Sequence, residues 1–308
     1  MLKLIFLIYL YFCVNPILYS QDLFMSYEKT GTIYKYNLNT NEDIKLFEGY
    51  QQSISPDGKK IAYTESDEKT GGRFISIYDI ESKTVKRMTS VPGDNSYFPR
   101  YSPDGNYLVF NHWTNNNWQI AIVSVDDRNF KILTENKIRN LNSFYSPSWT
   151  EDSKSIITHD MSNIIEFSIE GEVLNIYPLD KIDPSKKIFF SSASTVWFDK
   201  TNFALIFDCE VDNEFGGTYE NQNRIYRYDL LKNVITKISP DEYSATNPFI
   251  SFSSGKIFFN AFTKEDVIKK IEGEMEYFEL TYSIYNTDIK GDKFSFVLKN
   301  GTSPSLNK

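Results

Sequence analysis

The sequence predicts an all-β chain folded as a six-bladed β-propeller, in which each blade is a four-stranded antiparallel sheet. Two repeated features predict this fold. The tetrapeptide Ser-Pro-Asp-Gly occurs at residues 55–58 and again at residues 102–105, each time followed by a short apolar run. A strand of alternating apolar, aromatic and polar residues occurs six times along the chain, once in each repeat. Four-stranded units of about forty to fifty residues are typical of propeller blades.

The tetrapeptide has the chemistry of a tight turn. Proline presets φ, aspartate accepts hydrogen bonds from its own backbone, and glycine adopts positive φ without strain. Degenerate copies of the turn follow at similar spacing, at residues 150–153, 198–201 and 252–255. Just before these turns we expect buried inner strands, because the equivalent residues are mostly large and apolar: Ile54, Tyr101, Trp149, Trp197 and Ser251.

The second repeated feature predicts the third strand of each blade. Its six copies lie at residues 33–37, 75–79, 120–124, 164–168, 225–229 and 282–286. Alternating β-branched and aromatic residues favour strands over helices. Six copies therefore indicate six blades.

The first repeat lacks an inner strand, because the chain enters it at the second strand, residues 23–27. The C-terminal tail, residues 303–308, resembles the start of an inner strand. We expect the tail to complete blade 1 and close the ring. The alternative is a frayed tail.

The N-terminus has the pattern of a secretory signal peptide. Lys3 precedes the apolar run of residues 4–14, and a small residue, Ser20, comes before Gln21. The run is too short for a transmembrane helix. Cys13 suggests a lipoprotein alternative, although bulky residues precede it. We expect residues 1–20 to be removed, residues 21–308 to form one propeller domain without a membrane span, and the protein to be periplasmic or secreted.

Composition limits the partners. A formal net charge of −8 and a pI near 5.0 disfavour nucleic acid and anionic membrane surfaces. Cys209 is the only cysteine after position 20, so an intrachain disulfide is excluded from the mature chain. Its neighbours in sequence indicate a small buried side chain rather than a reactive thiol. We expect a monomer without a cofactor.

The turn and the third-strand motif together resemble the repeat of TolB-like propellers, and they are also similar to the propeller repeats of the prolyl oligopeptidase and dipeptidyl-peptidase group. The resemblance covers residues 22–308 and is most specific in blades 2 and 3. It implies a six-bladed ring in the envelope of a Gram-negative bacterium that works by binding a protein or another ligand. The shared motif is structural, so the resemblance supplies no catalytic residues. The sequence departs from the Tol–Pal member of that family in one respect: we expect no counterpart of its separate N-terminal α/β domain.

Three segments depart from the repeat, and we expect them to form long loops around one mouth of the central channel. They are residues 111–118 in blade 3, the acidic residues 210–220 in blade 5, and residues 263–280 in blade 6. In the last segment Val267, Ile268, Ile271 and Met275 recur at helical spacing, which predicts a short amphipathic helix. Function concentrates in such loops.

Candidate ligand-binding residues lie in or beside these segments. Trp113 and Trp118 either stack on a sugar ring or a partner side chain, or one of them packs between blades. His112 and His159 are the only histidines. Either they share a metal with Asp160 or Asp208, or they are hydrogen-bonded histidines at the rim, which the lack of a metal motif favours.

Arg100 precedes an inner strand, where it faces the channel and binds a carboxylate or pairs with an acid between blades. The sequence has no nucleophile elbow, phosphate-binding loop or paired zinc motif. The best prediction is therefore an exported, non-catalytic propeller that binds an envelope protein or a glycan through the channel mouth. The alternative is a carbohydrate-active enzyme, a lyase or glycoside hydrolase, that uses Asp160, Asp208 and Glu210 as its carboxylates.

Overall fold

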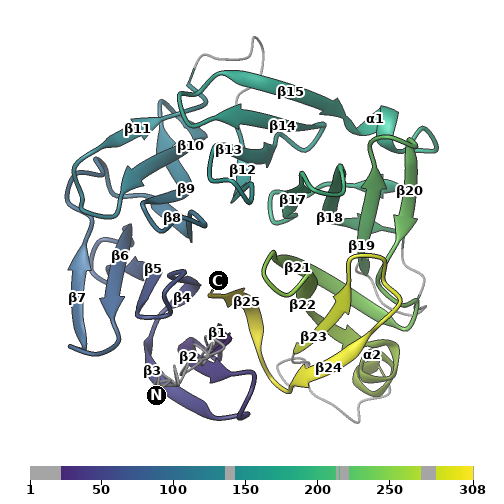
Figure 1. The fold of residues 1–308 in the computed structure, drawn as a ribbon, viewed down its shortest axis with the longest axis horizontal. Coiled ribbons are helices and arrows are strands. Elements are labelled where there is room, and N and C mark those ends of the chain that lie inside the picture. Colours follow the sequence, from purple (N-terminus) through teal and green to yellow (C-terminus); the bar gives the residue numbers. More distant parts are fainter. Residues whose placement is uncertain (1–21, 136–142, 213–214, 216–221, 272–281, 308) are drawn as a thin grey trace, which may run out of the picture.

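Six antiparallel sheets stand in a ring in the computed structural model, which describes residues 22–135, 143–212, 215, 222–271 and 282–307 (Figure 1). The strands of the first three blades, from the innermost outward, are: blade 1, β25 (Thr302–Leu306), β1 (Phe24–Lys29), β2 (Thr32–Asn37) and β3 (Asp43–Glu48); blade 2, β4 (Tyr50–Ile54), β5 (Lys60–Ser66), β6 (Arg73–Asp79) and β7 (Thr84–Arg87); blade 3, β8 (Ser96–Tyr101), β9 (Tyr107–Thr114), β10 (Asn117–Ser124) and β11 (Phe130–Ile132). The predicted six-bladed propeller is confirmed.

The second half of the ring follows the same order with one irregularity. Its strands are: blade 4, β12 (Tyr145–Trp149), β13 (Ser155–His159), β14 (Asn163–Ser168) and β15 (Val173–Pro178); blade 5, β16 (Ile188–Phe189) and β17 (Val196–Asp199), then β18 (Ala204–Val211), β19 (Gln222–Asp229) and β20 (Val234–Lys237); blade 6, β21 (Tyr243–Ser251), β22 (Lys256–Thr263), β23 (Ser283–Asp288) and β24 (Ser295–Leu298). In blade 5 the inner position is divided, because β16 and β17 pair with different stretches of β18.

The C-terminal tail closes the ring, as the sequence predicts. Strand β25 pairs antiparallel with β1, so that Met25 faces Leu306 and Ser26 faces Ser305. Beyond the strand, the Asn307 side chain accepts a hydrogen bond from the Phe24 amide at 2.6 Å and donates one to the Asp22 carbonyl at 3.1 Å. The two ends of the described chain are thus held in one sheet.

The turns between the first and second strands show why the tetrapeptide recurs. In blade 3 the Ser102 hydroxyl donates to Asp104 at 2.6 Å and accepts from the Tyr107 amide, while the Gly105 amide donates to the Ser102 carbonyl. Ser55 and Asp57 make the same set of bonds in blade 2. Gly58 and Gly105 have φ of +70° and +76°, the left-handed region that the turn requires.

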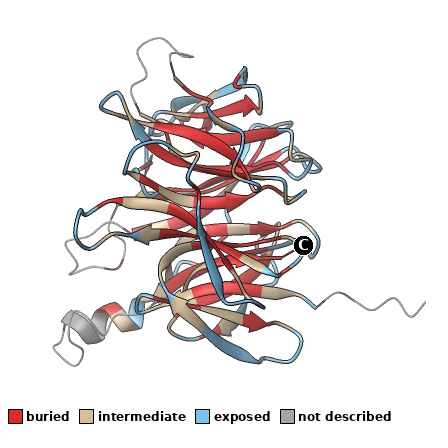
Figure 2. Cartoon of the chain, turned by 90° about the vertical axis from the view of Figure 1, so that its left-hand side faces the viewer, coloured by how far each residue is buried: buried red, intermediate tan, exposed pale blue. Residues whose placement is uncertain are grey.

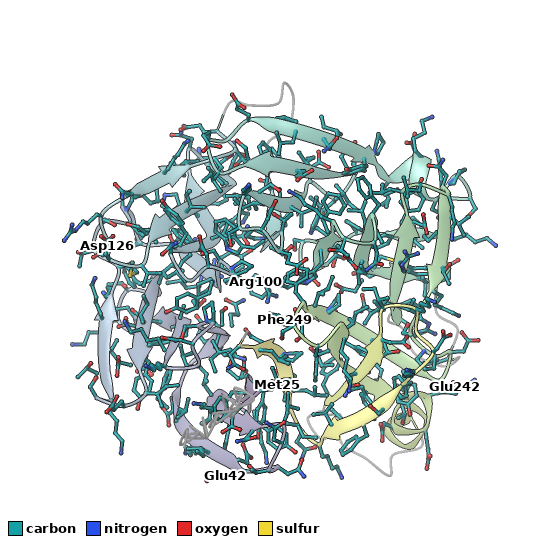
Figure 3. All side chains as sticks on the ribbon, viewed as in Figure 1. Met25, Glu42, Arg100, Asp126, Glu242 and Phe249 are labelled. Atoms are coloured by element: carbon teal, nitrogen blue, oxygen red, sulfur yellow. The ribbon has the colours of Figure 1, made fainter. Side chains whose placement is uncertain are left out.

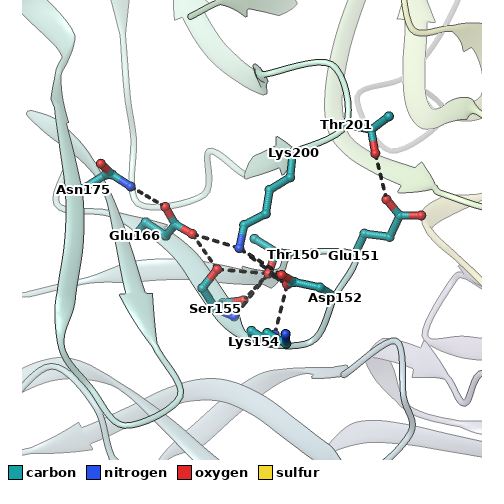
Figure 4. Close-up of polar contacts among 9 residues, drawn as sticks. All are labelled: Thr150, Glu151, Asp152, Lys154, Ser155, Glu166, Asn175, Lys200 and Thr201. Atoms are coloured by element: carbon teal, nitrogen blue, oxygen red, sulfur yellow. Dashed lines mark hydrogen bonds and ion pairs between the residues drawn. The ribbon is translucent and has the colours of Figure 1, made fainter.

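The degenerate turn of blade 4 keeps the same hydrogen bonds with different residues (Figure 4). Thr150 replaces the serine and donates to Asp152 at 2.7 Å. Lys200, from the corresponding turn of blade 5, pairs with Asp152 at 3.3 Å and with the buried carboxylate of Glu166 at 3.4 Å. The polar pair, rather than the literal tetrapeptide, is what the fold needs at this position.

The apolar core consists of separate layers between neighbouring blades. The described residues form six buried clusters, each drawing side chains from two adjacent blades. Val109 and Trp149, for example, belong to the layer between blades 3 and 4. Buried residues follow the interior strands, whereas exposed ones lie on turns and outer strands (Figure 2). Because a blade buries its two faces only against its neighbours, each layer depends on an intact ring.

Among the described residues two helices lie outside the blades: α1 (Leu179–Ile182) precedes blade 5, and α2 (Lys264–Ile271) extends from β22. The predicted amphipathic helix is confirmed over α2, where Thr263 and Asp266 bond each other's backbone amides as a cap. Residues 272–280 of that prediction, and the whole predicted signal peptide, lie outside the described residues. Neither helix is long and apolar enough to cross a membrane, within the part of the chain that the structure describes.

Candidate functional site at the channel mouths

Each inner strand runs from one face of the ring to the other, so the channel has two mouths. We call the face where the inner strands begin the hairpin face; it includes Tyr97, Phe98, Ser146 and Asn247. The opposite face, with Pro56, Pro103, Glu151 and Phe252, is the turn face. On the hairpin face a cavity of about 330 Å³ is lined by Gln51, Tyr97, Phe98, Ser146, Ser192, Ala193, Thr246, Asn247, Asn260 and Tyr282.

A repeated β-bulge shapes this cavity. In five of the six blades one inner-strand residue has positive φ and the pairing register shifts beside it: Gln51, Phe98, Ser146, Asn247 and Ser303. A proline directly follows four of these residues: Pro99, Pro147, Pro248 and Pro304. Proline is compatible with a strand at such a bulge because the ladder is already interrupted there. In blades 3 and 4 the proline stands three positions before Ser102 and Thr150, the first residues of the turns, so this spacing could have revealed those two bulges from the sequence.

The segment 111–118 forms the end of β9, the start of β10 and the turn between them. The prediction of a long loop in blade 3 is therefore wrong. Only Asn115 and Asn116 connect the strands, both with positive φ of 49° and 60°. This is the geometry of a two-residue type I′ hairpin, which asparagine tolerates well. The pairing places Trp113 directly opposite Trp118.

The two tryptophans belong to an aromatic ridge, which we define as Trp113, Trp118, Tyr97 and Arg73. The Trp113 and Trp118 rings meet edge to face at 5.0 Å, and the Trp118 and Tyr97 rings do so at 4.8 Å. The Arg73 guanidinium lies 4.4 Å from the Tyr97 ring centre. Trp113 remains 39% exposed, whereas Tyr97 lines the hairpin-face cavity. The ridge thus connects an exposed aromatic surface with the channel mouth.

Both histidines are buried and hydrogen-bonded. His159 bonds the Ser194 carbonyl through Nε2 at 2.8 Å and the Met161 amide through Nδ1 at 3.2 Å. Burial lowers the pKa of His159 to about 4. His112 bonds the Ser96 hydroxyl at 2.9 Å, and burial lowers its pKa too. Since both ring nitrogens of His159 have protein partners, a metal would have to displace one of them.

The three predicted carboxylates occupy separate surroundings. Asp160 accepts from the Ser162 and Asn163 amides in its own turn. Asp208 is buried and accepts from Thr195 at 2.7 Å and from Thr246 at 2.6 Å, and its pKa is raised by burial. Glu210 lies two residues further along β18. No group of three or more His, Cys, Asp or Glu side chains suited to a metal occurs among the described residues.

Arg100 crosses the centre of the channel between two opposite blades. From blade 3 it donates to the Asn247 amide oxygen of blade 6 at 3.2 Å. Its guanidinium also lies 4.4 Å from the Phe98 ring centre and 5.4 Å from that of Trp197. Arg100 lines the cavity on the turn face, whereas its partners Asn247 and Phe98 line the cavity on the hairpin face. Of the acidic segment in blade 5, residues 213–214 and 216–220 lie outside the described residues.

Comparisons with known proteins agree with this fold. No protein-family model matches the chain. The Tol-Pal system protein TolB of Francisella tularensis (strain WY96-3418) is 31% identical over 118 residues, which are 38% of this chain and 26% of that protein. The match thus spans about a quarter of the length of this curated relative.

Solved structures of low sequence identity share the whole ring. TolB from Acinetobacter baumannii matches with a TM-score of 0.63 and 15% identity over 93% of this chain and 66% of that one. A putative TolB from Agrobacterium tumefaciens matches with a TM-score of 0.59 and 13% identity, over 91% of this chain and 89% of that one. A chain of a nidogen–laminin complex matches with a TM-score of 0.58 and 9% identity, over 92% of this chain and 96% of that one. The chain is therefore a six-bladed β-propeller that is similar to TolB proteins in fold and, over part of its length, in sequence.

Proposed function

We propose that this chain is an exported, non-catalytic propeller that binds a partner protein of the cell envelope across the hairpin face. The resemblance to Tol-Pal system proteins supports a role in an envelope protein assembly. The aromatic ridge carries the proposal, because it joins the exposed Trp113, through Trp118, to Tyr97 in the lining of the hairpin-face cavity. Tryptophan anchors beside a cavity are typical of the residues that dominate protein interfaces.

The proposed export includes removal of the first twenty residues as a signal peptide. We expect the protein isolated from its native host to begin at Gln21, as measured by intact mass and N-terminal sequencing. It should be released with the periplasmic fraction or the medium. A chain that keeps residues 1–20 and fractionates with the cytoplasm would contradict export.

The binding face is best tested by photo-crosslinking in living cells. A photoreactive phenylalanine analogue at Thr114, next to Trp113 on β9, should form an adduct with a partner protein. The additional change Trp113→Ala should reduce that adduct about tenfold or more, because losing a central aromatic anchor costs 2 kcal/mol or more of binding free energy.

A matched control is available on the far edge of the ring. Leu231, in the β19–β20 turn, is 74% exposed and lies away from the hairpin face. The probe at this position, and Leu231→Ala combined with the Thr114 probe, should leave the adduct pattern unaffected. Equal adducts from both probe positions, or an adduct that Trp113→Ala does not weaken, would contradict the proposed face. An adduct removed by glycosidases but not by proteases would indicate a glycan instead of a protein.

The carbohydrate-active alternative is not favoured. Glycoside hydrolysis needs two carboxyl groups that flank one bond. Asp160 is held within its own turn in blade 4, and both oxygens of Asp208 bind Thr195 and Thr246. The hydrogen bonds thus direct these carboxylates toward protein groups in different blades.

A further inference from the structure

The turn face has a cavity of its own, to which the proposed function assigns no role. Its volume is about 310 Å³, and every blade contributes to its lining. The walls are mainly apolar and aromatic, and they include Trp149, Trp197, Phe249 and Phe252. Arg100 also lines this cavity, whereas it does not line the one on the hairpin face.

The two indoles are held by hydrogen bonds between blades. Trp149 donates through Nε1 to the Arg100 carbonyl at 3.0 Å, and Trp197 donates to the Pro248 carbonyl at 2.6 Å. The Trp197 ring also packs edge to face on the rings of Phe249 and Phe252, with ring centres 5.0 Å and 6.2 Å apart. Since both indole N–H groups already have acceptors, the side chains present their hydrocarbon surfaces to the cavity. The two indoles therefore supply apolar wall surface that is held in a fixed orientation.

At the inner end of the cavity is a buried positive charge. Arg100 is only 6% exposed, and Figure 3 shows it near the centre of the ring, across from Phe249. No carboxylate lies within ion-pairing distance of it in the described part of the chain; the nearby Asp208 is bound by two threonines. Its hydrogen-bond partner is the neutral Asn247 amide. Burial accordingly lowers the pKa of Arg100 to about 10.

We propose that the turn-face cavity binds a ligand with a carboxylate on an aromatic or branched apolar body. The carboxylate would meet the Arg100 guanidinium, whose planar donors match two carboxylate oxygens. The apolar body would lie against the indole and phenyl surfaces, where burial from water is favourable. A free aromatic acid and the C-terminus of a peptide that ends in an apolar residue share this chemistry.

Calorimetry with charged and neutral probes tests this site in the purified mature protein. 2-Naphthoate should bind at least tenfold more tightly than 2-naphthamide, and Arg100→Gln should abolish that difference, because hydrogen bonds to a charged group contribute about tenfold to a hundredfold in affinity. A peptide ending in Phe, as free acid and as amide, tests the second source. The proposal stands if either pair shows the Arg100-dependent difference, and it is overturned if neither does.

Two controls separate this site from general effects. Glu151 lies at the rim of the same cavity, so Glu151→Gln changes the local charge without touching the guanidinium. It should leave naphthoate binding equal or tighter. If Arg100→Gln lowers stability, Phe252→Ala provides a second variant, because Phe252 is only partly buried; it should weaken both naphthalene probes equally. Loss of the Thr114 adduct in cells would leave these results unaffected, since the two faces are tested separately.

Discussion

Removal of residues 302–308 is expected to unfold the propeller or leave it aggregated at 37 °C. The deletion takes away β25, the inner strand of blade 1, together with the buried Leu306 side chain. Loss of a buried leucine costs about 2–5 kcal/mol, and each lost ladder hydrogen bond adds about 1 kcal/mol. The sum approaches the whole stability of a typical domain. Circular dichroism and urea unfolding of the truncated chain measure the effect.

A single substitution provides a graded version of the same test. Asn307→Ala removes both side-chain hydrogen bonds to residues 22 and 24 and should lower the free energy of unfolding by about 1–3 kcal/mol. Leu231→Ala on the exposed β19–β20 turn should change it by less than about 0.5 kcal/mol. A truncated chain as stable as the full chain would show that the ring does not depend on its closing strand.

Closure was predictable because it follows from local patterns and arithmetic. The six third-strand motifs predict six blades, but the first repeat has no inner strand. The tail was therefore expected to supply that strand. The turns were equally predictable, since the hydrogen bonds that shape the turn at Ser102, Asp104 and Gly105 join residues no more than five positions apart. Such short-range chemistry is visible in any single repeat.

The site depends on contacts that no local pattern contains. The Arg100–Asn247 hydrogen bond joins residues 147 positions apart, across the channel. The sequence suggested that Arg100 faces the channel, but it gave no reason to expect Trp197 and Phe98 beside the guanidinium. The blade 3 segment is ambiguous in sequence, because the adjacent asparagines Asn115 and Asn116 are typical of long loops but also suit the tightest hairpin turn.

The stability of the propeller should fall as the pH decreases below 6.5, and His159 should be a main cause. In the folded state the His159 ring is buried, with Nε2 bonded to the Ser194 carbonyl. Burial disfavours the charged ring and lowers the pKa of His159 to about 4 from the usual 6.5. The unfolded chain therefore takes up a proton between these pH values while the folded chain does not. Each pH unit within that window lowers the free energy of unfolding by up to about 1.4 kcal/mol. Above pH 6.5 the ring is neutral in both states and the effect vanishes.

Urea unfolding at pH 7.5 and pH 5 measures this dependence, and the loss attributable to His159 should be about 2 kcal/mol over that range. His159→Gln keeps a donor and an acceptor without a titrating group, so it should be less stable at pH 7.5 but lose less between the two values. His112, whose pKa is also lowered, remains in this variant as an internal reference. Asp208 acts in the opposite direction, because its raised pKa favours proton uptake by the folded state as the pH falls. The comparison between wild type and variant removes that contribution, and equal losses in both proteins would show that His159 is not responsible.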